Sequence, residues 1–146
     1  MRLAFAIVAL SLLTGCGGYK LPSGVPPAIG QLRVQYAMRV IEIEPGSGKP
    51  YEPGKLLKVH YSGYLSDGSK FDSSRDRDTP FQFEQGKRKV IPGFDNCCES
   101  LRVGGKRRLL IPYQLAYGEK GRPPKIPAKS ELIFDIELLD VLDPPK

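Results

Sequence analysis

Residues 59–94 read VHYSGYLSDGSKFDSSRDRDTPFQFEQGKRKVIPGF, and this stretch combines strand and turn signals with a concentration of aromatic side chains. The aromatic, aliphatic and acidic residues that stand out in it are Tyr61, Phe71, Phe94, Val90, Ile91 and Asp72. Rings grouped around a single polar residue are typical of an apolar binding cleft. Neither a nucleophile–base pair nor a metal-ligand cluster accompanies them. The stretch therefore predicts a cleft that works by shape and low polarity.

Length and charge limit what the chain can be. It has 146 residues and a formal net charge of +6. After removal of a leader, roughly 110 residues remain for one domain, plus a tether. A domain of that size can bury a core without disulfides. Lysines and arginines are scattered among acids and do not form the basic helix or stripe of nucleic-acid-binding proteins. We expect a mildly basic, solvated surface and no nucleic-acid partner.

The chain begins with MRLAFAIVALSLLTGC, in which an apolar run from Leu3 to Leu13 follows one basic residue. A membrane-spanning helix needs about 20 apolar residues, so this shorter run has the length of a signal-peptide core. The run ends in Leu13-Thr14-Gly15-Cys16, which resembles the bacterial lipobox, where the signal is removed just before a cysteine that becomes lipidated. An ordinary secretory signal with an incidental cysteine is the alternative.

The lipobox resemblance implies an anchored protein with three segments. Residues 1–15 are the expected signal peptide, and lipidated Cys16 opens a flexible tether over 16–37, which is rich in Gly and Pro. Several acyl chains would anchor the protein stably, because one chain alone binds membranes only marginally. The residue after the cysteine is Gly17 and not an aspartate. By the sorting rule of bacterial lipoproteins, this implies the outer membrane, with the protein facing the periplasm. The folded domain is expected over 38–146.

Short alternating segments separated by Pro- and Gly-containing turns follow the tether and predict a sheet. The expected strands cover 38–44, 56–65, 70–72, 80–84, 106–112 and 131–143. A helix is expected over Phe94–Leu101, with Pro92 near its first turn and Gly104 after its end. The Pro- and Gly-rich segment 113–129 predicts a long functional loop. One short helix against about five antiparallel strands predicts an α+β domain with a half-buried sheet.

Four spaced segments closely resemble the FKBP-type peptidyl-prolyl isomerases, the immunophilins that bind tacrolimus. They are VHYSGYLSDGSKFDSSRDRDTPFQF, VIPGFD, LAYGEKG and ELIFDIELLDV. The resemblance extends from Val40 to Val141 and implies a curved antiparallel β-sheet wrapped around one short α-helix, with the active cleft between them. It also implies rotamase activity on proline-containing polypeptides and inhibition by tacrolimus-like macrolides. We expect no cofactor, no metal and a monomer.

This activity suits a cleft without a nucleophile. The barrier to rotation about a peptide bond is roughly 18–20 kcal/mol, while the two isomers of an Xaa-Pro bond differ by only about 0.5–1 kcal/mol. No covalent bond is broken, so no acid, base or metal is required. The planar amide is more dipolar than the twisted transition state, and an apolar pocket therefore disfavours the planar form. A hydrogen bond to the substrate carbonyl can hold the rotating group.

The resemblance assigns roles to individual residues. The expected catalytic residues are Asp72, Tyr117, Phe134 and Tyr61, and the expected substrate-binding residues are Phe71, Arg77, Phe81, Val90, Ile91, Phe94 and Ile126. Phe94 would be the floor under the proline ring, and the Tyr117 hydroxyl and the Ile91 amide would donate to the substrate carbonyl. Asp72 would be held by the Tyr61 hydroxyl and Arg77, because a buried acid needs partners to remain charged. Plain core packing for the rings and a turn-capping role for Asp72 are the alternatives.

Three positions depart from the well-known cytosolic members of the family. Those members carry Trp at the position of Phe94, commonly an acid at that of Lys89, and a histidine at that of Arg122. The floor is therefore smaller and the rim more basic, which affects macrolide affinity and peptide preference more than basic activity.

Two adjacent cysteines, Cys97 and Cys98, lie in the expected helix. Neighbouring cysteines rarely form a disulfide comfortably, so we expect one buried and one exposed thiol. An intermolecular disulfide in an oxidising compartment is the alternative, and the role of the pair stays open.

Two other functions are alternatives to catalysis. A non-catalytic peptide-binding or holdase module would use the cleft on extended segments, although the chain lacks the large inserted flap of chaperone-like relatives. A structural or adhesive surface lipoprotein would not need the cleft.

Overall fold

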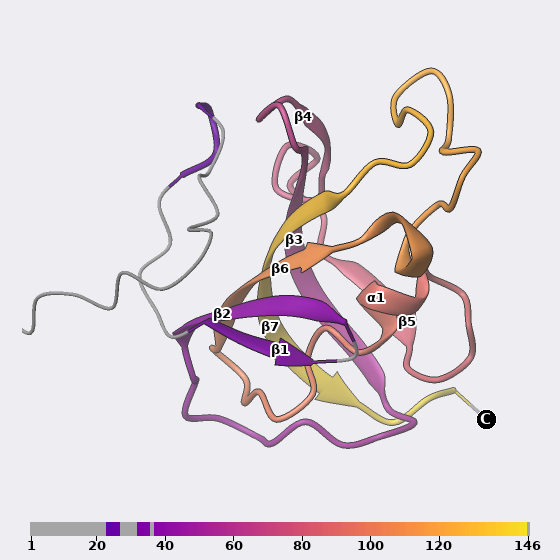
Figure 1. Ribbon diagram of the computed structural model, residues 1–146. Helices are drawn as coiled ribbons and strands as arrows, with labels where there is room; N and C mark the ends of the chain where they lie inside the picture. Colours follow the sequence, from indigo (N-terminus) through magenta and orange to yellow (C-terminus); the bar gives the residue numbers. More distant parts are fainter. Residues whose placement is uncertain (1–22, 27–31, 36, 146) are drawn as a thin grey trace, which may run out of the picture.

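The computed structural model describes residues 23–26, 32–35 and 37–145 (Figure 1). The predicted signal peptide and Cys16 lie outside the described residues, so both stay predictions. Within the described ranges, no helix has the length and apolar character needed to cross a bilayer.

Among the described residues, the strands form one antiparallel sheet with a single short α-helix on one side (Figure 1), which confirms the predicted α+β class. Its elements are β1 (Leu32–Gln35), β2 (Met38–Glu44), β3 (Leu56–Leu65), β4 (Lys70–Ser73), β5 (Phe81–Glu84), α1 (Pro92–Asp95), β6 (Lys106–Ile111) and β7 (Leu132–Leu142). The strand order is β1-β2-β6-β7-β3-β4, with β5 paired to β3. The expected loop 113–129 begins with a 3-10 turn, Tyr113–Leu115. In Figure 1 the sheet curves around α1, and this loop, in orange, extends beside it.

Strand β3 organises the sheet because it has three partners. One edge pairs with β7 along the whole strand. The other edge is divided between β5, which pairs with 56–59, and β4, which pairs with 62–64. Alternate residues of β3 are buried, as the period of two predicts, so Val59, Tyr61 and Gly63 all face the core. Residues from three other strands are thereby brought around Tyr61.

The predicted helix over Phe94–Leu101 is wrong in both bounds. Helix α1 begins at Pro92, whose fixed φ suits the first helical position, and it ends at Asp95. The following residues form turns, and Ser100 has a φ of 67° that no α-helix accommodates. Asn, Cys and Ser favour helices only weakly, so nothing local extends the helix.

Helix α1 packs very closely on the sheet. A Cβ added to Gly93 would lie 2.4 Å from the Cγ2 of Ile111 on β6 and 3.0 Å from the Met38 sulfur on β2. Only glycine permits this approach, which seats Phe94 over the sheet.

The sheet begins earlier than expected. Residues Leu32–Gln35 were assigned to the tether, yet they form β1 and pair with β2 in a register that joins Gln35 to Met38. Further upstream, Val25 is buried against Leu110 and Ile133. These two residues lie on the sheet face opposite to α1, because their neighbours Leu109 and Phe134 face the helix side.

Two arginines of β6 are buried, which contradicts the expectation that the basic residues form a solvated surface. The side chains of Arg107 and Arg108 are each 1% exposed. Arg107 donates to Glu42 at 2.6 Å and to the carbonyls of Cys97 and Glu99. Arg108 donates two hydrogen bonds to Asp135, at 2.6 and 2.7 Å. Such pairing is required because an unpaired buried charge is strongly destabilising.

The expectation of one exposed thiol is also wrong. Cys97 and Cys98 are both fully buried and unoxidised, with their sulfurs 3.3 Å apart. They lie in the turns after α1, where the chain packs back onto the core, and burial raises the pKa of the Cys97 thiol well above its ordinary value.

Candidate active site

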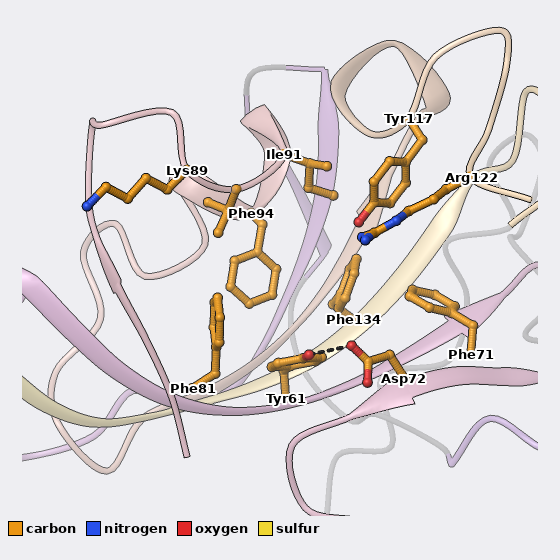
Figure 2. A pocket seen from close by; sticks show the side chains of 11 residues that line it. Tyr61, Phe71, Asp72, Phe81, Lys89, Ile91, Phe94, Tyr117, Arg122 and Phe134 are labelled. Atoms are coloured by element: carbon orange, nitrogen blue, oxygen red, sulfur yellow. Dashed lines mark hydrogen bonds between the residues drawn. The ribbon is translucent and has the colours of Figure 1, made fainter. Parts of the chain in front are cut away.

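Strand pairing assembles the site around Tyr61. Phe81 on β5 is opposite Val59, and Asp72 on β4 is opposite Gly63. On the other edge of β3, Phe134 of β7 is also opposite Gly63. The side chains of Phe81, Asp72 and Phe134 therefore surround Tyr61 from three strands (Figure 2).

The rings meet mainly edge to face. The Tyr61 ring centroid lies 5.7 Å from that of Phe81, 5.6 Å from that of Phe94 and 6.0 Å from that of Phe134. The Phe94 and Phe134 centroids are 5.2 Å apart, and those of Phe71 and Phe134 are 5.6 Å apart. Such contacts contribute about 0.5–1.5 kcal/mol per pair beyond burial and hold each ring in a defined orientation.

Gly63 makes the arrangement possible. A Cβ at this position would lie 2.6 Å from Cζ of Phe71 and 2.9 Å from Cε1 of Phe134. The glycine thus leaves space for two rings to meet over β3, and any side chain there would displace them.

The rings line an open cavity of about 290 Å³, close to the lower size of small-ligand sites. Its lining residues are Tyr61, Phe71, Asp72, Phe81, Lys89, Val90, Ile91, Phe94, Tyr117, Arg122 and Phe134. Of the residues expected to form the site, only Arg77 and Ile126 are absent from this lining. The structure therefore brings together side chains from β3, β4, β5, α1, β7 and two loops.

Asp72 is held in the cavity wall by the partners expected from the sequence. The Tyr61 hydroxyl donates to one carboxylate oxygen at 2.5 Å (Figure 2), and Arg77 donates to the other oxygen. Arg77 also donates to the Tyr61 hydroxyl oxygen at 3.0 Å. Partial burial raises the pKa of Asp72, but the hydrogen bonds from Tyr61 and Arg77 outweigh it and lower the pKa below its ordinary value. Asp72 is accordingly ionised at neutral pH.

Two donors are available to a bound carbonyl. The Tyr117 hydroxyl points toward the rings in Figure 2, and Ile91 lies at the N-terminus of α1 above Phe94. Among the described residues, no hydrogen bond uses the Tyr117 hydroxyl or the Ile91 amide. The cavity therefore combines apolar walls with two donors and one fixed carboxylate.

Ile126 lies in a second hollow that adjoins the first. This hollow has a volume of about 340 Å³ and shares Phe71, Asp72, Tyr117 and Arg122 with the first. Its other lining residues are Pro123, Pro124, Lys125 and Ile126. The backbones of Arg122 and Ile126 are joined by two hydrogen bonds, at 2.8 and 3.0 Å, which fold the loop into a wall. The site is thus a groove with two compartments.

Phe83 supports the site and was not among the residues expected from the sequence. Its ring stacks on Phe81 at 5.8 Å and meets Phe94 edge to face at 5.4 Å, beneath the floor. The period of two along β5 places Phe81 and Phe83 on the same face, so the pattern itself contained this signal.

His60, the one histidine of the chain, is half-buried on β3. Its Nδ1 lies 2.9 Å from the hydroxyl oxygen of Ser74, which is buried and also accepts from the Tyr61 amide. These contacts fix the loop after β4 to β3. In the described part of the chain, no three His, Cys, Asp or Glu side chains are grouped as a metal site requires.

Comparisons with known proteins agree with this geometry. Residues 48–139 match the model of the FKBP-type peptidyl-prolyl cis-trans isomerases. The peptidyl-prolyl cis-trans isomerase Fkbp12 of Drosophila melanogaster is 48% identical over 105 residues, which cover 71% of this chain and 97% of the relative. Among solved structures, AtFKBP13 aligns with a TM-score of 0.70 at 36% identity, covering 76% of this chain and 98% of that one. FkpA from Escherichia coli aligns with a TM-score of 0.71 at 37% identity, covering 78% of this chain and 53% of that one. This chain therefore belongs to the family of FKBP-type peptidyl-prolyl cis-trans isomerases.

Proposed function

We propose that this prolyl isomerase assists the folding of exported proteins and that its rotamase site is the first compartment of the groove. The observation that carries the site assignment is that apolar rings, one fixed carboxylate and two hydrogen-bond donors line a single cavity. The assignment to exported clients is supported by the signal-like apolar run at the start of the chain.

In the proposed mechanism the proline ring packs on Phe94 between Tyr61 and Phe134. The Tyr117 hydroxyl and the Ile91 amide donate to substrate carbonyl oxygens and hold one side of the bond while the other rotates. The apolar walls exclude water and disfavour the dipolar planar amide relative to the twisted one. Asp72, already paired with Tyr61 and Arg77, keeps the wall rigid and contributes a fixed negative charge beside the bond.

Tyr117→Phe tests the mechanism because it removes only the hydroxyl. One lost hydrogen bond in the transition state corresponds to about 0.5–1.5 kcal/mol, so kcat/KM should fall roughly two- to twelvefold. The rate is measured as cis–trans exchange of a proline peptide by NMR. Tyr113→Phe is the matched control, since Tyr113 lies in the same loop but lines neither compartment. Equal activity of the two variants would exclude a role for the Tyr117 hydroxyl.

We also propose that the protein is a lipoprotein of the outer membrane, facing the periplasm. Cleavage after residue 15 would leave Cys16 as the acylated N-terminus, and the residues between Cys16 and the sheet would form the tether. The support is the lipobox-like sequence Leu13-Thr14-Gly15-Cys16 and the Gly that follows it.

Membrane fractionation with labelled palmitate tests the anchor. Cys16→Ser should abolish labelling and release the folded domain from the membrane fraction. Cys97→Ser should leave both unchanged, because that thiol is buried in the domain. Membrane retention of the Cys16→Ser protein would show that the anchor is elsewhere.

The family binds macrolides such as FK506, and we propose that this chain binds them as a monomer in the same cavity. Phe94 provides a smaller floor than an indole, so binding is expected to be weaker than in relatives with Trp. Titration calorimetry with tacrolimus on the native protein and on Phe94→Trp, with sedimentation to measure mass, tests both points.

A further inference from the structure

Two loops that border the groove carry an excess of positive charge. One is 84–90, which begins at the last residue of β5, and the other is 116–130, between β6 and β7. Their cationic residues are Lys87, Arg88, Lys89, Lys120, Arg122, Lys125 and Lys129. Their only acids are Glu84 and Glu119. Since the whole chain carries a net charge of +6, a large part of the excess lies in these two loops, and Lys89, Arg122 and Lys125 line the groove itself.

Only three of these seven cations have an acidic partner among the described residues. Glu84 is shared by Lys87 and Lys89 at 3.5 and 3.7 Å, and Glu119 lies 3.8 Å from Lys129. Within the described residues, the remaining four form no ion pair. They are Arg88, Lys120, Arg122 and Lys125. An excess of one sign at a cleft raises the local concentration of oppositely charged ligands.

Arg122 differs from the others because it reaches into the groove. Figure 2 shows its guanidinium beside the Tyr117 hydroxyl, whereas the Lys89 ammonium points away from the rings. The guanidinium carbon lies 5.8 Å from the centroid of the Tyr117 ring, which orients it. Arg122 lines both compartments, so it stands at their junction.

The second compartment contains the chemistry to bind an acid. Its charged lining residues are Arg122, Lys125 and Asp72, and Asp72 is already paired with Arg77. The two cations are therefore without a countercharge. A guanidinium can bind a carboxylate through two parallel hydrogen bonds, which a single ammonium cannot.

We propose that the second compartment is a specificity subsite that binds an acidic side chain next to the substrate proline, with Arg122 as the main determinant and Lys125 in support. With the proline ring in the first compartment, the adjoining residue enters the second, where Arg122 binds its carboxylate. The preferred substrates are polypeptide segments in which Asp or Glu flanks proline. This proposal extends the isomerase activity and does not depend on the membrane anchor.

Matched peptides test the subsite. Two series, with the variable residue before or after proline, each carry Glu, Gln or Lys, and exchange rates are measured by NMR at low salt. For an exposed ion pair worth about 0.2–1 kcal/mol, kcat/KM for Glu should exceed that for Gln by roughly 1.4- to fivefold in at least one series, mainly through KM. The Lys peptide of that series should be the slowest. The ratio should approach one at 1 M salt, where the Debye length is about 3 Å.

Charge-removing variants decide between a subsite and a general charge effect. R122Q should reduce the Glu-to-Gln ratio to about one, and K125Q should reduce it partly. Lys49→Gln, which removes an exposed cation that lines neither compartment, should leave the ratio unchanged. A native ratio of one in both series would overturn the proposal, as would an unchanged ratio in the R122Q/K125Q double variant. In either case activity on the Gln peptides would show that the isomerase itself is intact.

Discussion

The acid in the cleft wall, Asp72, depends on two neighbours that approach it from different directions. Tyr61 donates from the strand beside it, and Arg77 donates from the following loop. The hydrogen bonds favour the ionised carboxylate, which is why the pKa is lowered although partial burial opposes it. The same contacts orient the Tyr61 ring, one of the walls of the cavity. A single residue thus links the electrostatics of the site to its shape.

Asp72→Asn keeps the shape of this side chain and removes its charge. A group with a lowered folded-state pKa stabilises the fold above its unfolded pKa, about 3.9, and loses that contribution as the pH falls. The side chain is 37% exposed, so screening by solvent limits the expected loss to about 0.5–1 kcal/mol at pH 7. Urea unfolding should show this difference at pH 7 and almost none at pH 2.5. Equal differences at the two values would mean that the charge of Asp72 does not stabilise the fold.

Helix α1 has only four residues, and its position depends on contact with the sheet more than on its own helix propensity. Gly93 allows it to approach β6, and Phe94 then reaches the cavity. The floor of the site is therefore placed by the docking of one element on another.

Gly93→Ala should force the helix away from β6, since the new Cβ would lie 2.4 Å from the Cγ2 of Ile111. Overpacking of this kind costs about 1–3 kcal/mol, and displacement of Phe94 should also lower activity. Ile111→Ala removes the atoms in the way, so the double variant should lose less stability than the sum of the single losses. Chemical unfolding of the four proteins measures this coupling, and strict additivity would show that the helix docks differently.

Most strands could be predicted from the sequence with nearly the observed bounds, whereas the bounds of the helix could not. Alternation along β3 identifies its buried face directly, because the period of two is a local property. The end of α1 at Asp95 depends on the turns that bury Cys97 and Cys98, which local propensity does not encode. The Gly- and Pro-rich composition before Met38 likewise concealed β1, whose hydrogen-bonding partner is β2.

Most residues of the site could be predicted, but the division of the site into two compartments could not. The resemblance to the family, and not the strand pattern, assigned these residues, and all of them except Arg77 and Ile126 line the first compartment. The second compartment arises from the fold of the loop between Arg122 and Ile126, which composition alone does not specify. The burial of Arg107 and Arg108 was also hidden, since their partners Glu42 and Asp135 are on other strands.

The two faces of the sheet have different roles in the whole molecule. The groove and α1 occupy one face, while Val25 is buried against Leu110 and Ile133 on the other. The segment that leads toward the proposed anchor therefore contacts the face away from the groove. Such an attachment leaves the groove open to client polypeptides.

Two groups ionise only at high pH, namely Cys97 in the core and Tyr51, which is half-buried against it. Complete burial raises the pKa of Cys97, with further raising by its contact with Cys98. Burial, followed by the charge of Glu99, raises the pKa of Tyr51 to about 12. Each group binds its proton more tightly in the folded protein than in the unfolded chain, where the values are about 8.5 and 10. A group whose pKa is raised by folding stabilises the folded state fully below its unfolded pKa. This contribution is lost as the pH rises from the unfolded pKa through the folded pKa.

The whole molecule should therefore become less stable in alkali, in two steps. Above about pH 8.5 the unfolded chain loses the Cys97 proton first, and the free energy of unfolding falls by up to about 1.4 kcal/mol per pH unit. Above about pH 10 the unfolded chain also loses the Tyr51 proton, which the folded protein keeps. The free energy of unfolding then falls more steeply with pH. Urea unfolding with a reducing agent between pH 7 and 11 measures the slope. Cys97→Ala should flatten the first step and Tyr51→Phe the second, whatever either change costs at pH 7. A native protein whose stability is constant from pH 7 to 10 would contradict the burial of the Cys97 thiol, because a solvent-exposed thiol ionises equally in both states.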